Sequence, residues 1–269
     1  MLQSRSIATV FAAVLLAAAV PARAIDVWEG GAGDDTSSSV NTIGQGDFQV
    51  HDLDQSGGGN DVDWIGVPAL NRHSYEARLS GTLVPFDFGG CTNCPQFERV
   101  SAAGTVLTED ESFINEGQVA ESFERSIRWV GTQDTVAEYL RVTGHLTNVE
   151  DASSTYKVRF WDTTYSIPRW NAVGGQATVF VITNLHQGNV AATIYFYNAA
   201  GALTATHPFT MGQNHGYVLS TASVPGLTGF SGHAHVVHNA GWGGLTGKAV
   251  ALEPATGFTF DTAMVPLSQ

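Results

Sequence analysis

The chain has 269 residues, of which 43% are hydrophobic and 14% are charged, a balance typical of a folded chain and unlike that of a disordered one. Its 12 Lys and Arg residues stand against 25 Asp and Glu residues, which gives a formal charge of −13. This composition excludes the dense basic surface that neutralises phosphates, so we expect no nucleic-acid partner and consider a bound cation more plausible.

The first 24 residues have the pattern of a signal peptide. A short basic start is followed by the apolar run Ile7–Val20 and by the small-x-small ending Ala22-Arg23-Ala24. The apolar run is too short to span a bilayer comfortably, and no later stretch approaches the roughly 20 apolar residues that a membrane helix needs. We therefore expect an exported mature protein that begins at Ile25, is extracellular or periplasmic, and does not insert into a membrane.

Residues 25 to 63 are rich in Gly, Asp and Ser and predict loops with a few short strands. Asp63 is the twelfth residue counted from Asp52, and the acidic, glycine-containing segment between them has the spacing of a calcium loop. We expect a calcium ion to bind here. The candidate ligands are Asp52, Asp54, Asp61 and Asp63, with Asp34 and Asp35 as further carboxylates of the region. The alternative is that these Asp residues only shape turns, which they favour.

Short alternations of apolar and polar residues after this region predict β-strands. In one of them Tyr156, Val158 and Phe160 point to one side while Lys157 and Arg159 point to the other, the pattern of a sheet with one buried and one wet face. The other strands predicted in this half are Tyr75–Leu79, Phe97–Val100, Ser126–Val130 and Tyr139–Val142. The acidic segment Glu109–Glu124 is compatible with a helical turn or with a long loop.

Cys91 and Cys94 are the only two cysteines of the chain. In an exported protein they meet an oxidising compartment, so a disulfide between them is the expected state. Two cysteines cannot complete a four-cysteine zinc site, and Pro95 and the surrounding strands do not supply the helix that follows a redox Cys-x-x-Cys motif. We expect the bridge to stiffen a short loop.

The composition changes near Thr163–Pro168, where charge-bearing strands give way to Thr, Ala, Val and Asn, and where proline disfavours the continuation of a central strand. We therefore predict two domains, 25–165 and 166–269. The second contains a hairpin turn at Asn198–Gly201, and its number and spacing of strands predict a β-sandwich of about 100 residues. Its predicted strands are Thr178–Thr183, Ala192–Asn198, Leu203–Thr206, His215–Ser220, Ser231–His238 and Gly247–Glu253.

His233, His235 and His238 form the nearest approach to a histidine cluster in the sequence. The two-residue period of a strand places His233 and His235 on one face and His238 on the other. Two imidazoles can hold zinc or copper with help from another strand, so His233 and His235 are candidate transition-metal ligands. The alternative is that they form an ordinary polar strand face.

The tryptophans divide by context. Trp64, Trp129 and Trp161 lie in predicted strands, where large aromatic side chains usually fill the space between sheets. Trp28 lies near the new N-terminus and Trp242 lies between glycines, so these two are the better candidates for ligand binding.

Four segments of the first half resemble the bacterial pre-peptidase C-terminal domain. They are Asn60–Ile65, with an aspartate-x-aspartate-aromatic pattern, Tyr75–Gly81, Glu138–Val142 and Tyr156–Arg159. The resemblance covers residues 34 to 162 and departs from the family at the acidic insertion and the cysteine loop. It implies a jelly-roll-like sandwich that accompanies secreted peptidases, in a family whose members sometimes bind calcium, matrix or polysaccharide. The second half looks like an Ig-like module without an assigned activity, on the segments Ile167–Asn171, Tyr195–Gly201 and Leu252–Phe258.

Common motifs of catalytic sites are absent from the sequence. It has no Gly-x-Ser-x-Gly nucleophile elbow, no His-Glu-x-x-His pair and no glycine-rich loop ending in Lys-Ser or Lys-Thr. We therefore expect a secreted, non-enzymatic, all-β binding or adhesion protein, stabilised by calcium, that recognises an extracellular polysaccharide or protein. The alternatives are a docking or inhibitory partner of a separately encoded secreted hydrolase, and a metal-dependent hydrolase.

Overall fold

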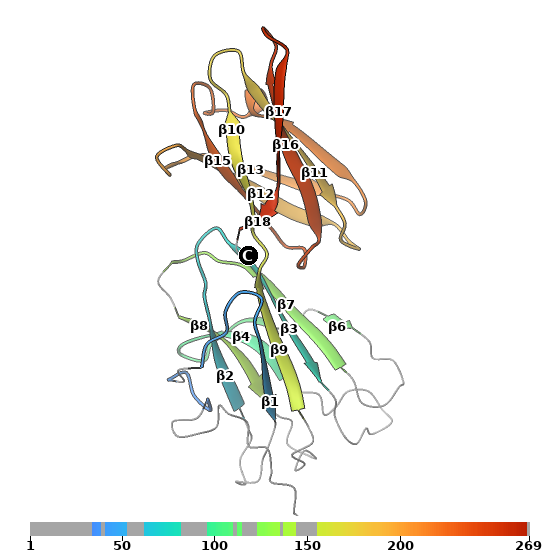
Figure 1. Ribbon diagram of the computed structural model, residues 1–269. Coiled ribbons are helices and arrows are strands. Elements are labelled where there is room, and N and C mark those ends of the chain that lie inside the picture. Colours follow the sequence, from blue (N-terminus) through green and yellow to red (C-terminus); the bar gives the residue numbers. More distant parts are fainter. Residues whose placement is uncertain are drawn as a thin grey trace, which may run out of the picture.

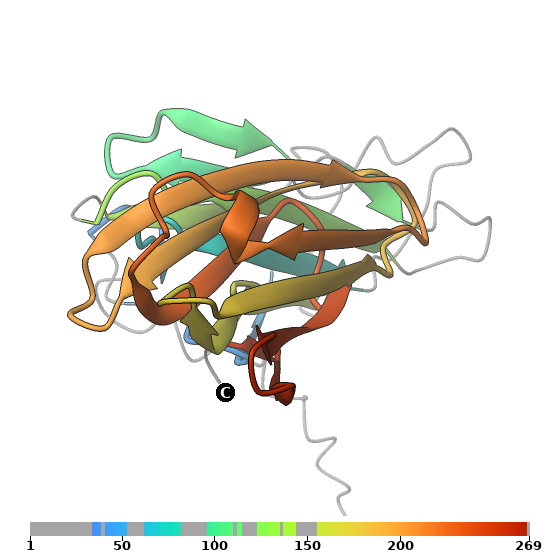
Figure 2. The same cartoon turned by 90° about the horizontal axis from the view of Figure 1, so that it is seen from above.

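A computed structural model describes residues 34–38, 41–52, 62–81, 96–109, 112–114, 123–134, 137–143 and 155–267. These residues form two β-sandwiches stacked end to end (Figure 1), and a view from above shows the second lying over the first (Figure 2). All paired strands are antiparallel in the described residues. The predicted all-β fold with two sandwiches is confirmed. The described part of the chain contains no helix with the length and apolarity needed to cross a membrane.

The first sandwich packs a five-stranded sheet of order β1-β9-β3-β7-β6 against a four-stranded sheet of order β2-β8-β4-β5. Its strands are β1 (Phe48–Asp52), β2 (Val62–Val67), β3 (Ser74–Gly81), β4 (Gln96–Ser101), β5 (Val106–Glu109), β6 (Ser112–Ile114), β7 (Phe123–Val130), β8 (Glu138–Thr143) and β9 (Thr155–Asp162). Strands β6 and β7 begin within the acidic segment that the sequence left unassigned.

The second sandwich packs a five-stranded sheet of order β13-β12-β15-β10-β18 against a four-stranded sheet of order β14-β11-β16-β17. Its elements are β10 (Tyr165–Asn171), β11 (Ala177–Asn184), β12 (Val190–Asn198), β13 (Leu203–Met211), β14 (Gly216–Ser220), the short 3-10 helix η1 (Thr221–Ser223), β15 (Ser231–His238), β16 (Leu245–Glu253), β17 (Phe258–Ala263) and β18 (Val265–Pro266).

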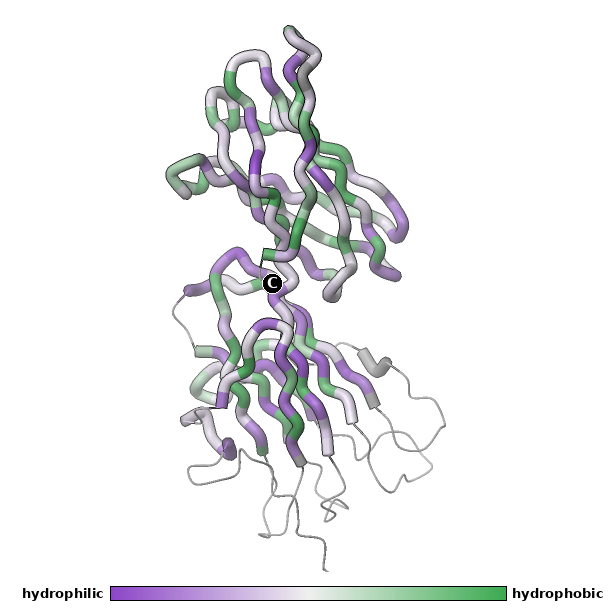
Figure 3. Tube along the Cα trace, in the orientation of Figure 1, coloured by the Kyte–Doolittle hydropathy of each residue, from purple (hydrophilic) through white to green (hydrophobic). Residues whose placement is uncertain are grey.

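Alternation along the strands builds both cores. On β9 the side chains of Tyr156, Val158 and Phe160 are buried, as predicted, and they pack among residues of both sheets. On β12 Ile194 and Phe196 do the same in the second sandwich. The colouring of Figure 3 shows this pattern as hydrophilic and hydrophobic residues that alternate along the strands.

Pro168 lies inside strand β10, where the sequence suggested that a central strand does not continue. The register between β10 and β15 shifts between Ile167 and Trp170, and β18 pairs only with Tyr165 and Ser166 of β10. Pro168 is therefore exposed at a bulge, where the ladder does not require its missing N–H group.

Thr163 and Thr164 link the two sandwiches, and the predicted division between residues 165 and 166 falls one residue beyond this link, after the first residue of β10. Both threonines are buried. The Thr163 N–H donates to the Ser74 carbonyl at 2.7 Å, and the Thr163 carbonyl accepts from His238 Nε2 at 2.9 Å. The link is therefore hydrogen-bonded to both sandwiches.

The expectation that strand tryptophans fill the core is wrong for Trp161 and Trp64. Trp161 follows Phe160 on β9, so the alternation turns its ring outward, where the Arg78 guanidinium lies 5.3 Å from the ring centroid. Trp64 is buried outside the core cluster, beside Tyr139 and Arg141 on the outer side of its sheet. Trp129 does pack between the sheets.

Candidate functional site

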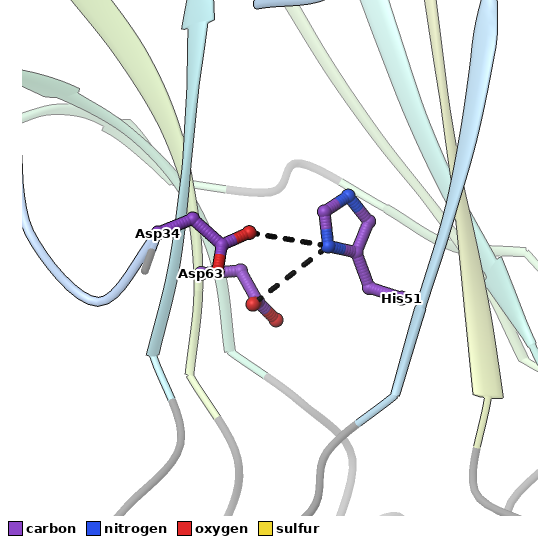
Figure 4. A group of neighbouring side chains, drawn as sticks. All are labelled: Asp34, His51 and Asp63. Atoms are coloured by element: carbon purple, nitrogen blue, oxygen red, sulfur yellow. Dashed lines mark ion pairs between the residues drawn. The ribbon is translucent and has the colours of Figure 1, made fainter. Parts of the chain in front are cut away.

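Three buried side chains, Asp34, His51 and Asp63, converge at the open edge of the first sandwich (Figure 4). We call this group the clamp. His51 Nδ1 lies 3.3 Å from Asp34 Oδ2 and 3.7 Å from Asp63 Oδ1, and the three side chains are at most 3% exposed. One ligand atom from each residue lies within 4.8 Å of the other two.

The neighbours of the clamp fix the orientation of the imidazole. Gln49 Nε2 donates to the Thr42 carbonyl at 2.9 Å, which leaves Gln49 Oε1 as the acceptor 3.1 Å from His51 Nε2. Since an amide oxygen only accepts, His51 Nε2 carries the proton and Nδ1 is the ring nitrogen that faces both carboxylates.

The carboxylates of the clamp are also held from outside it. The Tyr156 hydroxyl donates to Asp63 Oδ2, and Asn41 Nδ2 donates to Asp34 Oδ2 at 3.3 Å. The Tyr156 ring also stacks on the His51 imidazole, with centroids 5.3 Å apart. Such partners orient the ligands of a metal site and are part of its design.

The clamp lies where three separate parts of the first sandwich meet. His51 lies on β1 and Asp63 on β2, and these strands are the edges of the two facing sheets. Asp34 adds a segment that precedes both strands, and its carbonyl accepts from the Trp64 N–H at 2.7 Å. The clamp therefore joins both sheets and an N-terminal segment at one edge.

The donor set of the clamp suits a positive charge placed between two carboxylates. Ligands of a tetrahedral ion bound at 2.0–2.2 Å lie about 3.3 Å from one another, a spacing close to the distances in the clamp. Imidazole with carboxylates suits zinc and related ions, whereas calcium takes six to eight oxygen ligands and needs more than these three groups supply. A proton on His51 Nδ1 would also place a positive charge between the two carboxylates, and the imidazolium would then form ion pairs with them.

The structure places only part of the predicted calcium site. Asp34 and Asp63 meet in the clamp, while Asp35 is exposed. Asp52 ends β1 directly after His51, and Asp54 and Asp61 lie outside the described residues. His51 was not among the predicted ligands, and a calcium ion at this edge stays a prediction.

The cysteine and tryptophan predictions fall largely outside the described residues. Cys91, Cys94 and Trp28 all lie there, so the disulfide stays a prediction. Trp242 is 37% exposed, and its backbone N–H donates to Glu76 Oε2 of the first sandwich at 2.7 Å. It lies at the junction of the two sandwiches, and ligand binding by its ring stays a prediction.

His233 and His235 lie side by side on the outer face of β15, with ring centroids 5.4 Å apart. Burial, followed by the nearby histidines, lowers the pKa of His235 to about 4. His238 is buried at the end of the same strand, where burial lowers its pKa to about 4 and where it contacts the link between the sandwiches. Metal binding by His233 and His235 stays a prediction.

A second candidate surface was missed by the sequence analysis. The outer face of the five-stranded sheet in the first sandwich carries cations and aromatic rings together, and we call it the basic face. Its members are Phe48 on β1, Arg78 on β3, Arg128 on β7, and Lys157, Arg159 and Trp161 on β9. The cross-strand register places Arg159 between Phe48 and Arg78, in one row across three strands.

Only part of the positive charge of the basic face is neutralised by contacts with carboxylates of the same face. Arg78 and Arg128 both bond to Glu76, whose side chain is fully buried. Lys157 and Arg159 instead lie 4.8 and 5.5 Å from the ring centroid of Phe48, which is 55% exposed. Among the described residues, neither of these two cations forms an ion pair.

Comparisons with known proteins identify no family for this chain. No family model matches it, and no curated protein matches it. The resemblance to the pre-peptidase C-terminal domain therefore stays a prediction. One solved structure that matches the chain is the N-terminal CBM22-1-CBM22-2 tandem domain of Xyn10C from Paenibacillus barcinonensis, with 10% identity over 84% of this chain and 99% of that chain. Its TM-score is 0.25, and at that value the likeness carries no argument.

Proposed function

We propose that this is an exported, non-enzymatic binding protein that holds an acidic polysaccharide on the basic face. One observation carries the proposal. The chain has a formal charge of −13 and only 12 Lys and Arg residues, yet four of these cations lie on one sheet face together with Phe48 and Trp161.

The chemistry of the face fits the carboxylate groups of such a polymer. Guanidinium groups bind carboxylates with two parallel hydrogen bonds, and an ammonium group adds a compact positive charge. The flat face of an aromatic ring provides an apolar surface for a sugar ring. The acidic remainder of the chain repels an anionic polymer, which directs binding to this face.

The form of the face also favours a polymer over a small molecule. Small ligands bind in concave pockets that bury most of their surface. The part of the basic face formed by β1 and β9 is instead an exposed side of a sheet, with Phe48 and Val50 of the edge strand 55% and 44% exposed. An extended chain can lie across several strands of such a surface.

The burial of the clamp supports a structural role for it instead of a catalytic one. Its side chains are at most 3% exposed, so a polymeric substrate does not reach the imidazole or the carboxylates. We propose that the clamp holds a divalent cation that joins the edges of the two sheets. Calcium and zinc are the ions to compare, because the carboxylates suit the first and the imidazole suits the second.

Affinity electrophoresis tests the proposed function. Gels containing polygalacturonate or alginate should retard the protein, and gels containing a neutral β-glucan should not. Substitution of both Lys157→Ala and Arg159→Ala should remove most of the retardation. Lys248→Ala is the matched control, because Lys248 is an exposed cation of the second sandwich that pairs with Asp261 at 3.0 Å.

Two results would contradict the proposal. Equal retardation by acidic and neutral polymers would remove the role of the cations, and unchanged retardation of the double variant would place the binding elsewhere. Capture of a secreted hydrolase from culture medium, with no retention on polysaccharide, would favour the docking alternative instead.

A further inference from the structure

Three histidines from different parts of the chain meet at the junction of the two sandwiches. His73 lies directly before β3 in the first sandwich, while His233 and His235 lie on β15 in the second. The ring centroids of His73 and His235 are 6.0 Å apart, and those of His233 and His235 are 5.4 Å apart. His235 is therefore the central ring of the three.

His73 is held as a histidine ligand of a metal site usually is. Its Nδ1 lies 2.7 Å from Asp162 Oδ2, and the other oxygen of Asp162 accepts from the Thr164 N–H at 2.9 Å. Since a carboxylate only accepts, His73 Nδ1 carries the proton and Nε2 is the nitrogen left for a ligand. Carboxylate–histidine pairs of this kind orient the imidazoles that bind zinc.

His235 provides a second, independent observation. Its Nδ1 atom is buried and has no hydrogen-bond partner among the described residues, a condition that is costly for a polar atom. Tyr197 packs against both neighbouring imidazoles, with its ring centroid 5.1 Å from that of His233 and 5.0 Å from that of His235. The site thus has an aromatic wall and an unsatisfied nitrogen donor.

We propose that His73, His233 and His235 bind one divalent transition-metal ion, such as Zn²⁺ or Cu²⁺, across the junction. Two imidazoles on one tetrahedral ion, with metal–nitrogen bonds of 2.0–2.1 Å, have ring centroids about 5 Å apart. The separations of 5.4 and 6.0 Å are close to this value. In the described residues only the clamp has three ligand atoms within 4.8 Å of one another, so binding at the junction requires the three imidazoles to rotate toward a common ion.

An ion at the junction would fix the orientation of the two sandwiches relative to each other, because one ligand belongs to the first sandwich and two belong to the second. An ion in the clamp has all its ligands in the first sandwich and cannot do this. The proposal does not depend on polysaccharide binding, because the three histidines are not members of the basic face.

Calorimetric titration with Zn²⁺ and paramagnetic resonance with Cu²⁺ test the proposal together. Wild-type protein should show nitrogen splitting from three imidazoles in the Cu²⁺ spectrum. In a background that carries Asp63→Asn, which removes the clamp as a second zinc site, His235→Ala and His73→Gln should each weaken Zn²⁺ binding more than tenfold. The Gln side chain can still donate to Asp162, so His73→Gln separates loss of the ligand nitrogen from loss of structure. His215→Ala, at an exposed position before β14, is the control and should bind as the wild type does.

Each remaining outcome overturns the proposal. Failure of the wild type to bind Zn²⁺ would do so, as would unchanged affinity in His73→Gln with the fold confirmed by circular dichroism. A Cu²⁺ spectrum with one nitrogen, lost in His51→Ala, would place the ion in the clamp and not at the junction.

Discussion

The two sandwiches have similar architecture but are stabilised in different ways. Among the described residues, each sandwich contains one buried apolar cluster. The two differ in their buried charged side chains. Those of the first sandwich are Asp34, Asp63, Glu76, Glu98, Arg99, Arg125, Glu138 and Asp162, whereas the buried polar side chains described in the second are uncharged groups and His238.

This difference indicates where each sandwich is vulnerable. Buried charges contribute little net stability when they are paired, because they lose their hydration, but the loss of one partner leaves an expensive charge in the interior. An apolar core loses stability through cavities instead. The first sandwich should therefore respond to ions and to the loss of charge partners, and the second should respond to truncation of its core.

The largest expected effect is a cavity in the second sandwich. Phe196→Ala removes a fully buried ring that contacts Trp170 and Phe180 edge-on, and should destabilise this sandwich by about 3–5 kcal/mol. Differential scanning calorimetry should show its transition at a lower temperature. If the unfolding temperature reported by tryptophan fluorescence of the first sandwich decreased by the same amount, the two sandwiches would unfold as one unit.

Arg99→Ala should have the next largest effect. Arg99 holds Glu138 through two hydrogen bonds of 2.7 and 2.8 Å, and both side chains are nearly buried. Its removal should cost about 3 kcal/mol in urea unfolding of the first sandwich, because the Glu138 carboxylate remains buried without this partner.

A charge-free control sharpens this prediction. The double variant Arg99→Ala with Glu138→Ala should be more stable than Arg99→Ala alone, and Lys248→Ala at the exposed pair should change stability by less than about 1 kcal/mol. A double variant less stable than the single one would show that packing, not charge, holds this position.

His238 should make the second sandwich sensitive to acid. Burial lowers its folded pKa to about 4 from 6.5, so the unfolded state binds the proton more readily. The stability is complete above the unfolded pKa of about 6.5 and falls as the pH decreases from there to about 4. The loss should be roughly 3 kcal/mol, measured as the pH dependence of thermal unfolding.

A matched variant isolates this effect. His238→Gln can keep a donor toward the Thr163 carbonyl but does not titrate, so its stability should lose that part of the pH dependence. The prediction is wrong if the wild type and His238→Gln have parallel stability curves between pH 6.5 and 4.

Removal of the ion from the clamp should have the smallest effect. At a free ion concentration ten times its dissociation constant, binding adds about 1.4 kcal/mol to stability. Chelator should therefore lower the melting temperature of the first sandwich, and addition of zinc or calcium should restore it. Asp63→Asn should abolish this response. An unchanged wild-type melting curve with chelator and with both ions would contradict the proposed ion.

Much of the fold could be predicted because its strands follow the two-residue period. The alternation of β9 is readable in the sequence, and the same period, continued by one residue, places Trp161 with Lys157 and Arg159 on the outer face. The basic face could thus have been found from β9 itself. The basic face was missed because tryptophan side chains generally prefer the core, and Trp161 was therefore assigned to the core.

The clamp could not be predicted from the pattern of β1. There the apolar residues Phe48 and Val50 are exposed, while Gln49 and His51 are buried, which inverts the usual rule. The inversion is possible because Gln49 bonds to the Thr42 carbonyl and to His51, while the other side of the His51 imidazole meets Asp34 and Asp63. Tertiary contacts of this kind leave no local signal, and the same is true of the approach of His73 to His235.

The most direct test of the account is a calorimetric titration with oligogalacturonate at two salt concentrations. The proposed function predicts binding to the wild type and to Lys248→Ala that weakens as salt increases, since exposed charges are screened. It predicts at least tenfold weaker binding to the Lys157→Ala, Arg159→Ala variant. Wild-type affinity in that double variant, or an affinity that does not change with salt, would contradict it.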